Sequence, residues 1–308
     1  IKFSHVVAND TPKGKAAVFF KQRAEELTKG KVEVEVYPNS TLYKDKEELE
    51  ALQLGAVQML APSLAKFGPL GVREFEVFDL PYLFDSYAEL HKVTQGPVGR
   101  QLLAKLEPKG IKGLAYWDNG FKVFSSNQPI RTVEDFAGQR MRIQPSKVLE
   151  AQMRALGVLP QVMAFSEVYQ ALQTGVVDGT ENPPSNLYTQ NMHEVQKYVR
   201  VSNHGYLGYA VITNEKFWDA LPAEVRGQLE QAMRESTDYA NQIAKEENDA
   251  ALEAVRKSGK STVYVPTGDE RLAFKKVLVP VHKTMESRIG KETIEKVYKE
   301  TGFDPSKL

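Results

Sequence analysis

Residues 171–178 read Ala-Leu-Gln-Thr-Gly-Val-Val-Asp, and residues 51–58 read Ala-Leu-Gln-Leu-Gly-Ala-Val-Gln, so five of the eight positions are identical. Each copy predicts a helix that ends on a glycine, Gly55 or Gly175, because glycine readily adopts the left-handed conformation that closes a helix. A short apolar strand and then a proline follow each glycine. The repeat predicts two topologically similar lobes, each sending the loop at a strand end toward a shared cleft, where open α/β sheets bind ligands. The alternative is that this pattern is simply a common way to end a helix.

The sequence before the first copy extends the α/β pattern. Thr11 predicts the N-cap of a helix, with Pro12 at its first position. Asp45 and Glu48, three residues apart, predict a capping-box start for the helix that ends at Gly55. Strands alternate with these helices, so we expect an α/β fold in which each lobe is a mainly parallel sheet flanked by helices.

One predicted helix is unusually long. From about Pro222 to Ser258 the chain has no internal proline or glycine apart from Gly227. At 1.5 Å per residue such a helix spans roughly 50 Å, which is more than the width of one small domain. We therefore expect a two-lobed fold in which this helix spans both lobes. The expected division places residues 1–120 and about 209–247 in the first lobe, and residues 121–208 and about 248–308 in the second.

The composition is that of a globular protein without a strong net charge. The 308 residues suffice for about two domains, and 40 Lys and Arg balance 40 Asp and Glu. Proteins that bind nucleic acids or anionic membrane surfaces normally carry an excess of basic residues. We therefore expect no nucleic-acid partner. No uncharged apolar stretch approaches the roughly 18 residues that a membrane helix needs.

The residue types that catalysis or metal binding would need are missing or scattered. The chain has no cysteine, which excludes disulfides, thiolate metal sites and cysteine nucleophiles. It also has no dinucleotide, Walker-type phosphate, nucleophile-elbow or zincin motif. The histidines occur singly, at His5, His91, His193, His204 and His282. None is paired at a metal-ligand spacing, so we expect no catalytic residue, no metal and no cofactor.

Several cations lie at predicted strand ends or helix starts. Arg142 lies in the alternating segment 139–145, on the face opposite to the apolar members and at a predicted strand end, and its planar guanidinium can hold a carboxylate by two parallel hydrogen bonds. Lys122 lies at a turn that leads into an apolar strand and is a candidate second cation. Lys13 and Lys15 lie in the opening turns of the first helix, where free N–H groups and positive charge favour an anion. Lys66 lies on the predicted cleft loop. Each of them is alternatively an exposed basic side chain.

Neutral side chains complete the candidate site. Asn182 precedes a proline, which favours an extended backbone and presents its amide from a loop. Ser63 lies on the cleft loop that follows the first repeat. Trp117, Tyr206 and Tyr209 are candidates to line the cleft, although aromatic residues at strand ends are more often part of the core.

Residues 163–183, which contain the second repeat, closely resemble the signature of the solute-binding proteins of TRAP transporters. The likeness extends over nearly the whole chain. Within that family, residues 4–8, 61–67 and 116–122 are similar to the dicarboxylate-binding branch, which takes up succinate, malate and fumarate. The resemblance implies a two-lobed extracytoplasmic protein that closes on an organic acid and delivers it to a membrane permease driven by an ion gradient.

The resemblance also assigns roles to residues of this chain. It implies that Arg142 is the principal carboxylate clamp and that Asn182 is a supporting contact. Sialic-acid-binding relatives have an arginine in place of Lys122 and a glutamate in place of Ser63, which favours a smaller, doubly charged acid here. We expect Arg142 and Lys122 to hold one carboxylate. Lys15, Lys66 or Ser63, together with the start of the first helix, would hold the other.

The remaining expectations concern the setting of the protein. The chain begins at Ile1 in a predicted strand, as a mature periplasmic protein would after cleavage of its signal peptide, although a trimmed chain would begin in the same way. We expect a monomer whose partners are a small dicarboxylate and the membrane subunits of a TRAP transporter. The alternatives are a binding protein for another organic acid, a co-receptor for a sensor, and a secreted enzyme acting on small acids.

Overall fold

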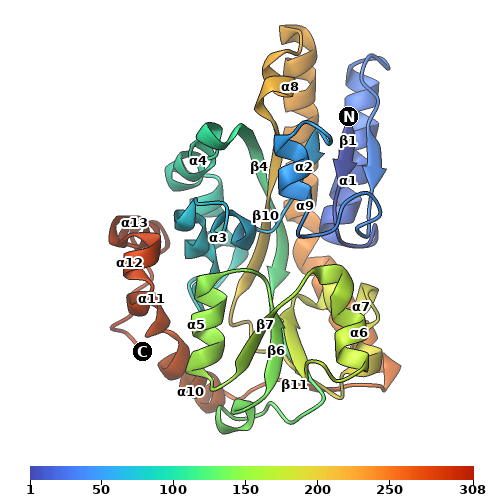
Figure 1. Cartoon of the computed structure of the whole chain (residues 1–308). Coiled ribbons are helices and arrows are strands. Elements are labelled where there is room, and N and C mark those ends of the chain that lie inside the picture. Colours follow the sequence, from blue (N-terminus) through green and yellow to red (C-terminus); the bar gives the residue numbers. More distant parts are fainter.

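The computed structural model describes all 308 residues and has two lobes, each built on one β-sheet with helices packed around it (Figure 1). The first lobe contains, in sheet order, β2 (Glu35–Tyr37), β1 (Lys2–Ser4), β3 (Met59–Leu60), β10 (Tyr206–Asn214) and β4 (Ile111–Phe121). The second lobe contains β11 (Thr262–Tyr264), β9 (Tyr198–Arg200), β5 (Val123–Ser126), β8 (Gly179–Asn182), β6 (Arg140–Ile143) and β7 (Leu159–Val162).

Both sheets are mainly parallel, as expected, but each contains one antiparallel strand, so both are mixed. In the first sheet β10 is antiparallel to both of its neighbours, and in the second sheet β5 is antiparallel to both of its neighbours. The reason is the connection between the lobes. β5 and β10 each begin directly after the chain has crossed from the other lobe, so both strands point away from the cleft. The strands of the βα units point toward the cleft, and β5 and β10 are therefore antiparallel to them.

The two sequence repeats form equivalent units in the two lobes. Helix α2 (Glu48–Gln53) leads through Gly55 into β3, and helix α6 (Val168–Gln173) leads through Gly175 into β8. Both glycines have the left-handed backbone that closes a helix, with φ of 82° and 76°. The repeat is therefore structural, because each copy delivers a strand end to the region between the lobes.

The two predicted helix starts have different outcomes. Helix α1 (Pro12–Leu27) begins as expected, since the side chain of Thr11 accepts a 3.0 Å hydrogen bond from the backbone N–H of Gly14. The capping box predicted at Asp45 is wrong. Helix α2 starts after Glu47, without a side-chain cap, because the Asp45 carboxylate is bound to side chains elsewhere.

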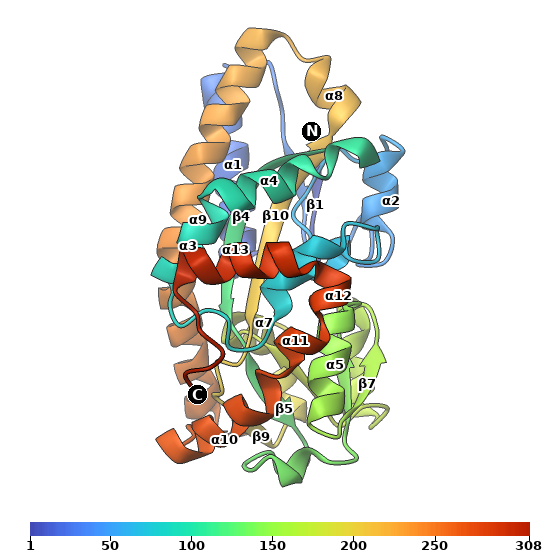
Figure 2. The same cartoon turned by 90° about the vertical axis from the view of Figure 1, so that its left-hand side faces the viewer.

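Helix α9 (Ala223–Ser258) is a single helix of 36 residues and runs along both lobes (Figures 1 and 2). It packs against α1 and β4 in the first lobe, and against α7 (Pro184–Thr189) and β11 in the second. It ends at Gly259, which has a φ of 69°.

The strands cross between the lobes at one place. β4 ends at Phe121 in the first sheet and β5 begins at Val123 in the second, so that only Lys122 separates them. The returning chain passes Gly205 before β10 begins. The N–H of Lys122 donates a 2.9 Å hydrogen bond to the carbonyl of Gly205, and the two crossings thus lie side by side.

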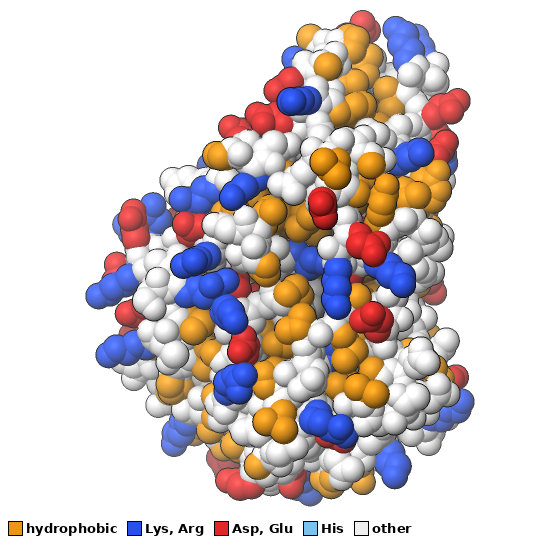
Figure 3. Space-filling view, viewed as in Figure 1, with side chains coloured by type: hydrophobic (Ala, Val, Ile, Leu, Met, Phe, Trp, Pro, Cys, Tyr) orange, Lys and Arg blue, Asp and Glu red, His pale blue; other side chains and the backbone are white.

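The remaining α-helices cover the outer faces of the lobes. They are α3 (Tyr87–Thr94), α4 (Pro97–Ala104), α5 (Lys147–Ala155), α8 (Glu215–Asp219), α10 (Gly268–Leu278), α11 (Val281–Thr284), α12 (Glu286–Ile289) and α13 (Lys291–Thr301). Short 3₁₀ helices occupy Leu64–Phe67, Arg73–Asp79, Glu107–Lys109, Glu134–Phe136, Phe165–Glu167 and Met192–Val195. Acidic and basic side chains are interspersed over the face shown in Figure 3, in keeping with the even charge count. None of the helices combines the length and apolar character needed to cross a membrane.

The end of the chain departs from the expected division into lobes. Residues after 248 were expected in the second lobe, and α10 does pack there, with Phe274 in an apolar cluster of that lobe. Helix α13, however, packs on α3 and α4, and buries Ile294 and Val297 in the main apolar cluster of the first lobe. The C-terminal helices therefore join the two lobes on the outside.

Candidate functional site

A small cavity lies between the lobes, where the strand ends of both repeats meet the start of α1. Its volume is about 20 Å³, room for about one water molecule. It is lined by Val6, Val7, Lys13, Asp45, Glu48, Pro62, Ser63, Arg142, Gln144, Phe165, Asn182, Asn186, Leu207 and Tyr209. This position, at the carboxyl ends of strands in both lobes, is the one that the repeat predicts.

The second lobe contributes two hydrogen-bond donors that have no partner in the protein. Arg142 lies on β6 and is 2% exposed; its Nε donates a 3.0 Å hydrogen bond to the carbonyl of Met163, whereas its Nη2 is unpartnered. Asn182 ends β8, and its Oδ1 accepts a 3.3 Å hydrogen bond from Asn186 while its Nδ2 is unpartnered. Buried polar groups are nearly always paired, and these two donors line one cavity, so both are available to a ligand that enters it.

The first lobe contributes a buried cation, Lys13. Its ammonium donates a 3.0 Å hydrogen bond to the carbonyl of Ala61 and lies 3.7 Å from the centre of the Tyr209 ring. Lys13 is 1% exposed, and this burial lowers the pKa of its ammonium to about 8. No carboxylate lies within salt-bridge distance of it, and the nearby Glu48 and Asp45 only partly offset the effect of burial on its pKa, so this charge is available to a negative ligand.

Two carboxyl groups also line the cavity. Burial raises the pKa of Glu48 to about 8, and its carboxyl accepts a 3.2 Å hydrogen bond from Ser4. Burial also disfavours the charged form of Asp45, but Lys66 and Arg142 outweigh it and hold the pKa of Asp45 below its usual value. Asp45 is thus kept ionised beside two cations.

Five of the ten candidate residues named from the sequence line the cavity, namely Lys13, Ser63, Arg142, Asn182 and Tyr209. The lysines expected with them have partners within the protein. Lys66 is bound to Asp45, with Nζ 2.8 Å from Oδ1, and Lys122 is bound to Glu181, with Nζ 2.7 Å from Oε2. Each lysine is buried with its counter-ion, so neither lines the cavity.

The other three expected residues also lie outside the cavity. Lys15 points to the opposite side of its helix, where its ammonium lies 2.6 Å from Glu247 of α9. The Trp117 ring is buried in the core of the first lobe, and its Nε1 donates a 2.9 Å hydrogen bond to Thr237. The hydroxyl of Tyr206 donates a 2.5 Å hydrogen bond to Asp118.

The sequence contains a pattern that favours Lys13 over Lys15 as the ligand contact, although Lys15 was the residue expected to hold the second carboxylate. Lys13 precedes Ala16, Ala17 and Phe20 by three, four and seven residues, and these three side chains form the buried face of α1. A lysine on the apolar face of a helix is buried with it, whereas Lys15 falls on another face. Helical phase therefore distinguishes the two lysines.

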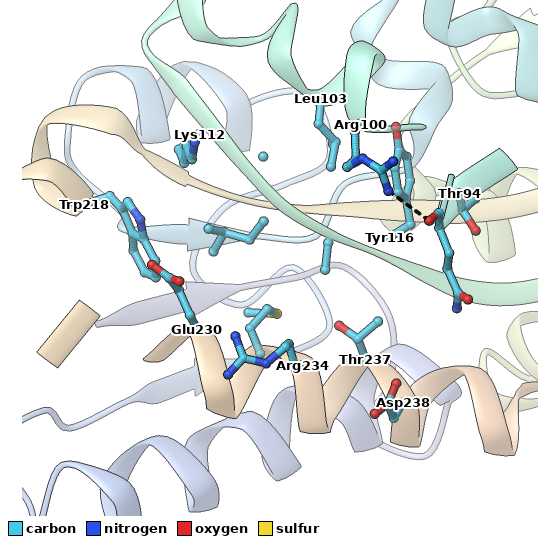
Figure 4. Close-up of a pocket in the computed structure, with 15 residues that line it drawn as sticks. Thr94, Arg100, Leu103, Lys112, Tyr116, Trp218, Glu230, Arg234, Thr237 and Asp238 are labelled. Carbon is cyan, nitrogen blue, oxygen red and sulfur yellow. Dashed lines mark hydrogen bonds between the residues drawn. The ribbon is translucent and has the colours of Figure 1, made fainter. Parts of the chain in front are cut away.

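A larger pocket of about 580 Å³ lies elsewhere on the first lobe, between α4, β4, α8 and α9 (Figure 4). Arg100, Arg234 and Lys112 line it together with Glu230 and Asp238, and Arg100 donates a 3.2 Å hydrogen bond to the carbonyl of the neighbouring Gln95. The pocket is open and its charges are of both signs. It offers no buried donor comparable to those between the lobes. No group of three or more histidine or acidic side chains in the chain is placed to hold a metal ion.

The fold and the cavity between the lobes define a solute-binding protein. Residues 3–288 match the DctP family, described as bacterial extracellular solute-binding protein family 7, and the chain belongs to this family. Over 297 residues it is 70% identical to the C4-dicarboxylate-binding periplasmic protein DctP of Rhodobacter capsulatus, covering 96% of this chain and 89% of that protein.

Two solved structures are similar in fold and sequence. One is a TRAP periplasmic solute-binding protein from Sulfurospirillum deleyianum with bound succinate, at 47% identity and a TM-score of 0.93, covering 96% of this chain and 97% of that one. The other, from Pseudomonas aeruginosa with bound L-malate, has 44% identity and a TM-score of 0.90, covering 92% of this chain and 99% of that one.

Proposed function

We propose that this protein binds a small dicarboxylate, such as succinate, malate or fumarate, between its lobes and delivers it to an ion-gradient-driven TRAP permease. The observation that carries the proposal is the pair of buried cations that face one cavity from opposite lobes, Lys13 and Arg142. A ligand with a carboxylate at each end compensates both charges at once, whereas a monocarboxylate leaves one of them unpaired.

The neighbouring groups fit the same ligand. The free N–H donors of Arg142 and Asn182 would hold one carboxylate, and Lys13 with the hydroxyl of Ser63 would hold the other. Lys122 contributes indirectly, because its ion pair with Glu181 fixes the strand that ends at Asn182. The names and bound ligands of the relatives, a C4-dicarboxylate-binding protein and complexes with succinate and L-malate, support this class of ligand.

Binding would require the lobes to move. A cavity of about 20 Å³ does not admit a four-carbon acid, so the lobes must part to let it enter. Because the strands cross only at Lys122 and near Gly205, rotation about these crossings, with bending of α9, would open the cleft. A ligand that touches both lobes would then stabilise the closed form.

We infer that the protein works in the periplasm as a monomer and has no catalytic activity. The names of its relatives, which describe periplasmic binding proteins, support the compartment and the role. The permease would recognise the closed form and receive the acid when the lobes part.

Isothermal titration calorimetry with succinate, malate, fumarate, propionate and a sugar acid such as galactonate tests the proposal. We expect the three dicarboxylates to bind and propionate not to bind. Arg142→Ala should weaken succinate binding by several kcal/mol, because it removes one partner of a buried charge pair. Arg140→Ala is the matched control, since Arg140 lies on the same strand but is exposed. The assignment is wrong if propionate or a sugar acid binds and none of the dicarboxylates does.

A further inference from the structure

Asp45 reaches from the first lobe to the second across the cavity. It precedes α2, and its Oδ1 is held by Lys66 of the same lobe at 2.8 Å. Its Oδ2 accepts a 3.3 Å hydrogen bond from the backbone N–H of Phe165 and lies 3.7 Å from Nη2 of Arg142. One carboxylate of the protein thus contacts a lysine of one lobe and two donors of the other.

These partners are of the kind that a ligand carboxylate would use. A cation from each lobe and a backbone N–H are the groups that bind a buried carboxylate. The distance of 3.7 Å is too long for a hydrogen bond, so Arg142 retains its free Nη2. Asp45 therefore offsets the charge of Arg142 but accepts no hydrogen bond from its Nη2. A carboxylate placed closer to Nη2 can compete for the same guanidinium.

The two carboxylates cannot both stay at Arg142 in the present arrangement. Asp45 lines the same cavity as Nη2, and that cavity has room for about one water molecule. A ligand carboxylate bound at Nη2 would lie against the ionised Asp45, and like charges at that separation repel each other strongly. Asp45 has to withdraw when the ligand arrives.

We propose that Asp45 occupies, in the ligand-free protein, the position of a ligand carboxylate at Arg142, so that binding exchanges one carboxylate for another. Asp45 then has two effects. It holds the lobes together when no ligand is present, and it sets the affinity, because each ligand must displace it. The second effect rests on the proposed function, whereas the first does not depend on the identity of the ligand.

Asp45→Asn tests both effects, with Asp10→Asn as the matched control. Asp10 is another first-lobe aspartate paired with a lysine, but it is exposed and lies outside the cavity. Small-angle scattering of the ligand-free proteins should give a larger radius of gyration for Asp45→Asn than for the wild type or the control. Titration with succinate should give a Kd about tenfold lower for Asp45→Asn, through faster association.

The scattering experiment needs no ligand, so it separates this proposal from the proposed function. A ligand-free Asp45→Asn protein as compact as the wild type would overturn the proposal even if succinate binds. A succinate affinity that is unchanged or weaker in Asp45→Asn would overturn it as well. If the wild type binds no dicarboxylate, the function is wrong, while the scattering still decides the role of Asp45. Asp45→Ser, which also removes the charge, provides the same readouts if the asparagine variant folds poorly.

Discussion

Lys13 and Lys15 offer the sharpest test of the site, because they lie two residues apart on one helix and differ in surroundings. Lys13 is buried at the cavity and has no carboxylate partner, whereas Lys15 is about one-third exposed and paired with Glu247. Lys13→Met keeps the length and volume of the side chain but removes its charge. We expect this change to remove the cation that binds one ligand carboxylate and to leave the fold intact.

The expected loss of affinity follows from the burial of the Lys13 ammonium and the ligand carboxylate that it would bind. Removing one partner of a buried hydrogen-bonded charge pair costs about 2 to 5 kcal/mol of binding, which weakens succinate binding at least about 30-fold. Lys15→Met should change Kd less than about threefold, because a partly exposed ion pair contributes about 0 to 1 kcal/mol. The ligand-free stability of Lys13→Met should equal or exceed that of the wild type, since an apolar side chain replaces a buried charge.

Calorimetry at several pH values provides a second readout. Lys13 must be protonated to pair with a carboxylate, and burial lowers its pKa to about 8 in the ligand-free protein. Above that pH, binding has to take up a proton, so the wild-type Kd should rise about tenfold per pH unit. Glu48 lines the same cavity with a pKa of about 8, so its ionisation adds to the rise. Lys13→Met should show a smaller rise that begins at higher pH, because Lys13 no longer lowers the pKa of Glu48. The reasoning is refuted if folded Lys13→Met binds succinate within threefold of the wild type, or if Lys15→Met is the variant that loses binding.

Two further predictions concern stability. Burial raises the pKa of Asp79 to about 7, so the folded protein binds a proton that the unfolded chain releases near pH 4, and this contribution to stability is lost as the pH rises to about 7. Asp79→Asn can still accept the hydrogen bond from Ser146 but does not titrate. Its free energy of unfolding in urea, relative to that of the wild type, should therefore increase by about 2 to 3 kcal/mol between pH 5 and pH 7. The same difference at both pH values would contradict this prediction. Gly14→Ala should destabilise by about 1 to 3 kcal/mol, because its Cβ would lie 2.3 Å from the carbonyl oxygen of Ala8. Gly227→Ala, with no atom within 4 Å of the added Cβ, should stabilise α9 by about 0.5 to 1 kcal/mol, and thermal unfolding of the pair would show opposite shifts.

The sequence predicted the features that depend on local chemistry. The left-handed glycines of the two repeats, the cap at Thr11 and the long helix to Ser258 follow from residues close together in the chain, and all three were confirmed. The placement of Arg142 and Asn182 at the cavity follows from their positions at strand ends, because the carboxyl ends of such strands face the cleft.

The features that the sequence did not predict depend on distant partners. The direction of β5 and β10 is set by the crossing between lobes, which hydrophobic periodicity does not report. Asp45 has the spacing of a helix cap, but ion pairs with residues 21 and 97 positions away determine its place. Lys122 likewise meets its counter-ion 59 residues later, at Glu181.

The misplaced lysines share one physical cause. A buried cation is available to a ligand only when the protein does not supply its counter-ion, since the pair costs less to bury than the lone charge. Lys66 and Lys122 are buried but carry their own carboxylates, so they contribute structure. Lys13 lacks a carboxylate partner, and Arg142 shares Asp45 with Lys66 at a longer distance. Selectivity for an anion thus resides in which cations are left uncompensated, a property that neither the total charge nor the number of basic residues near the cleft reveals.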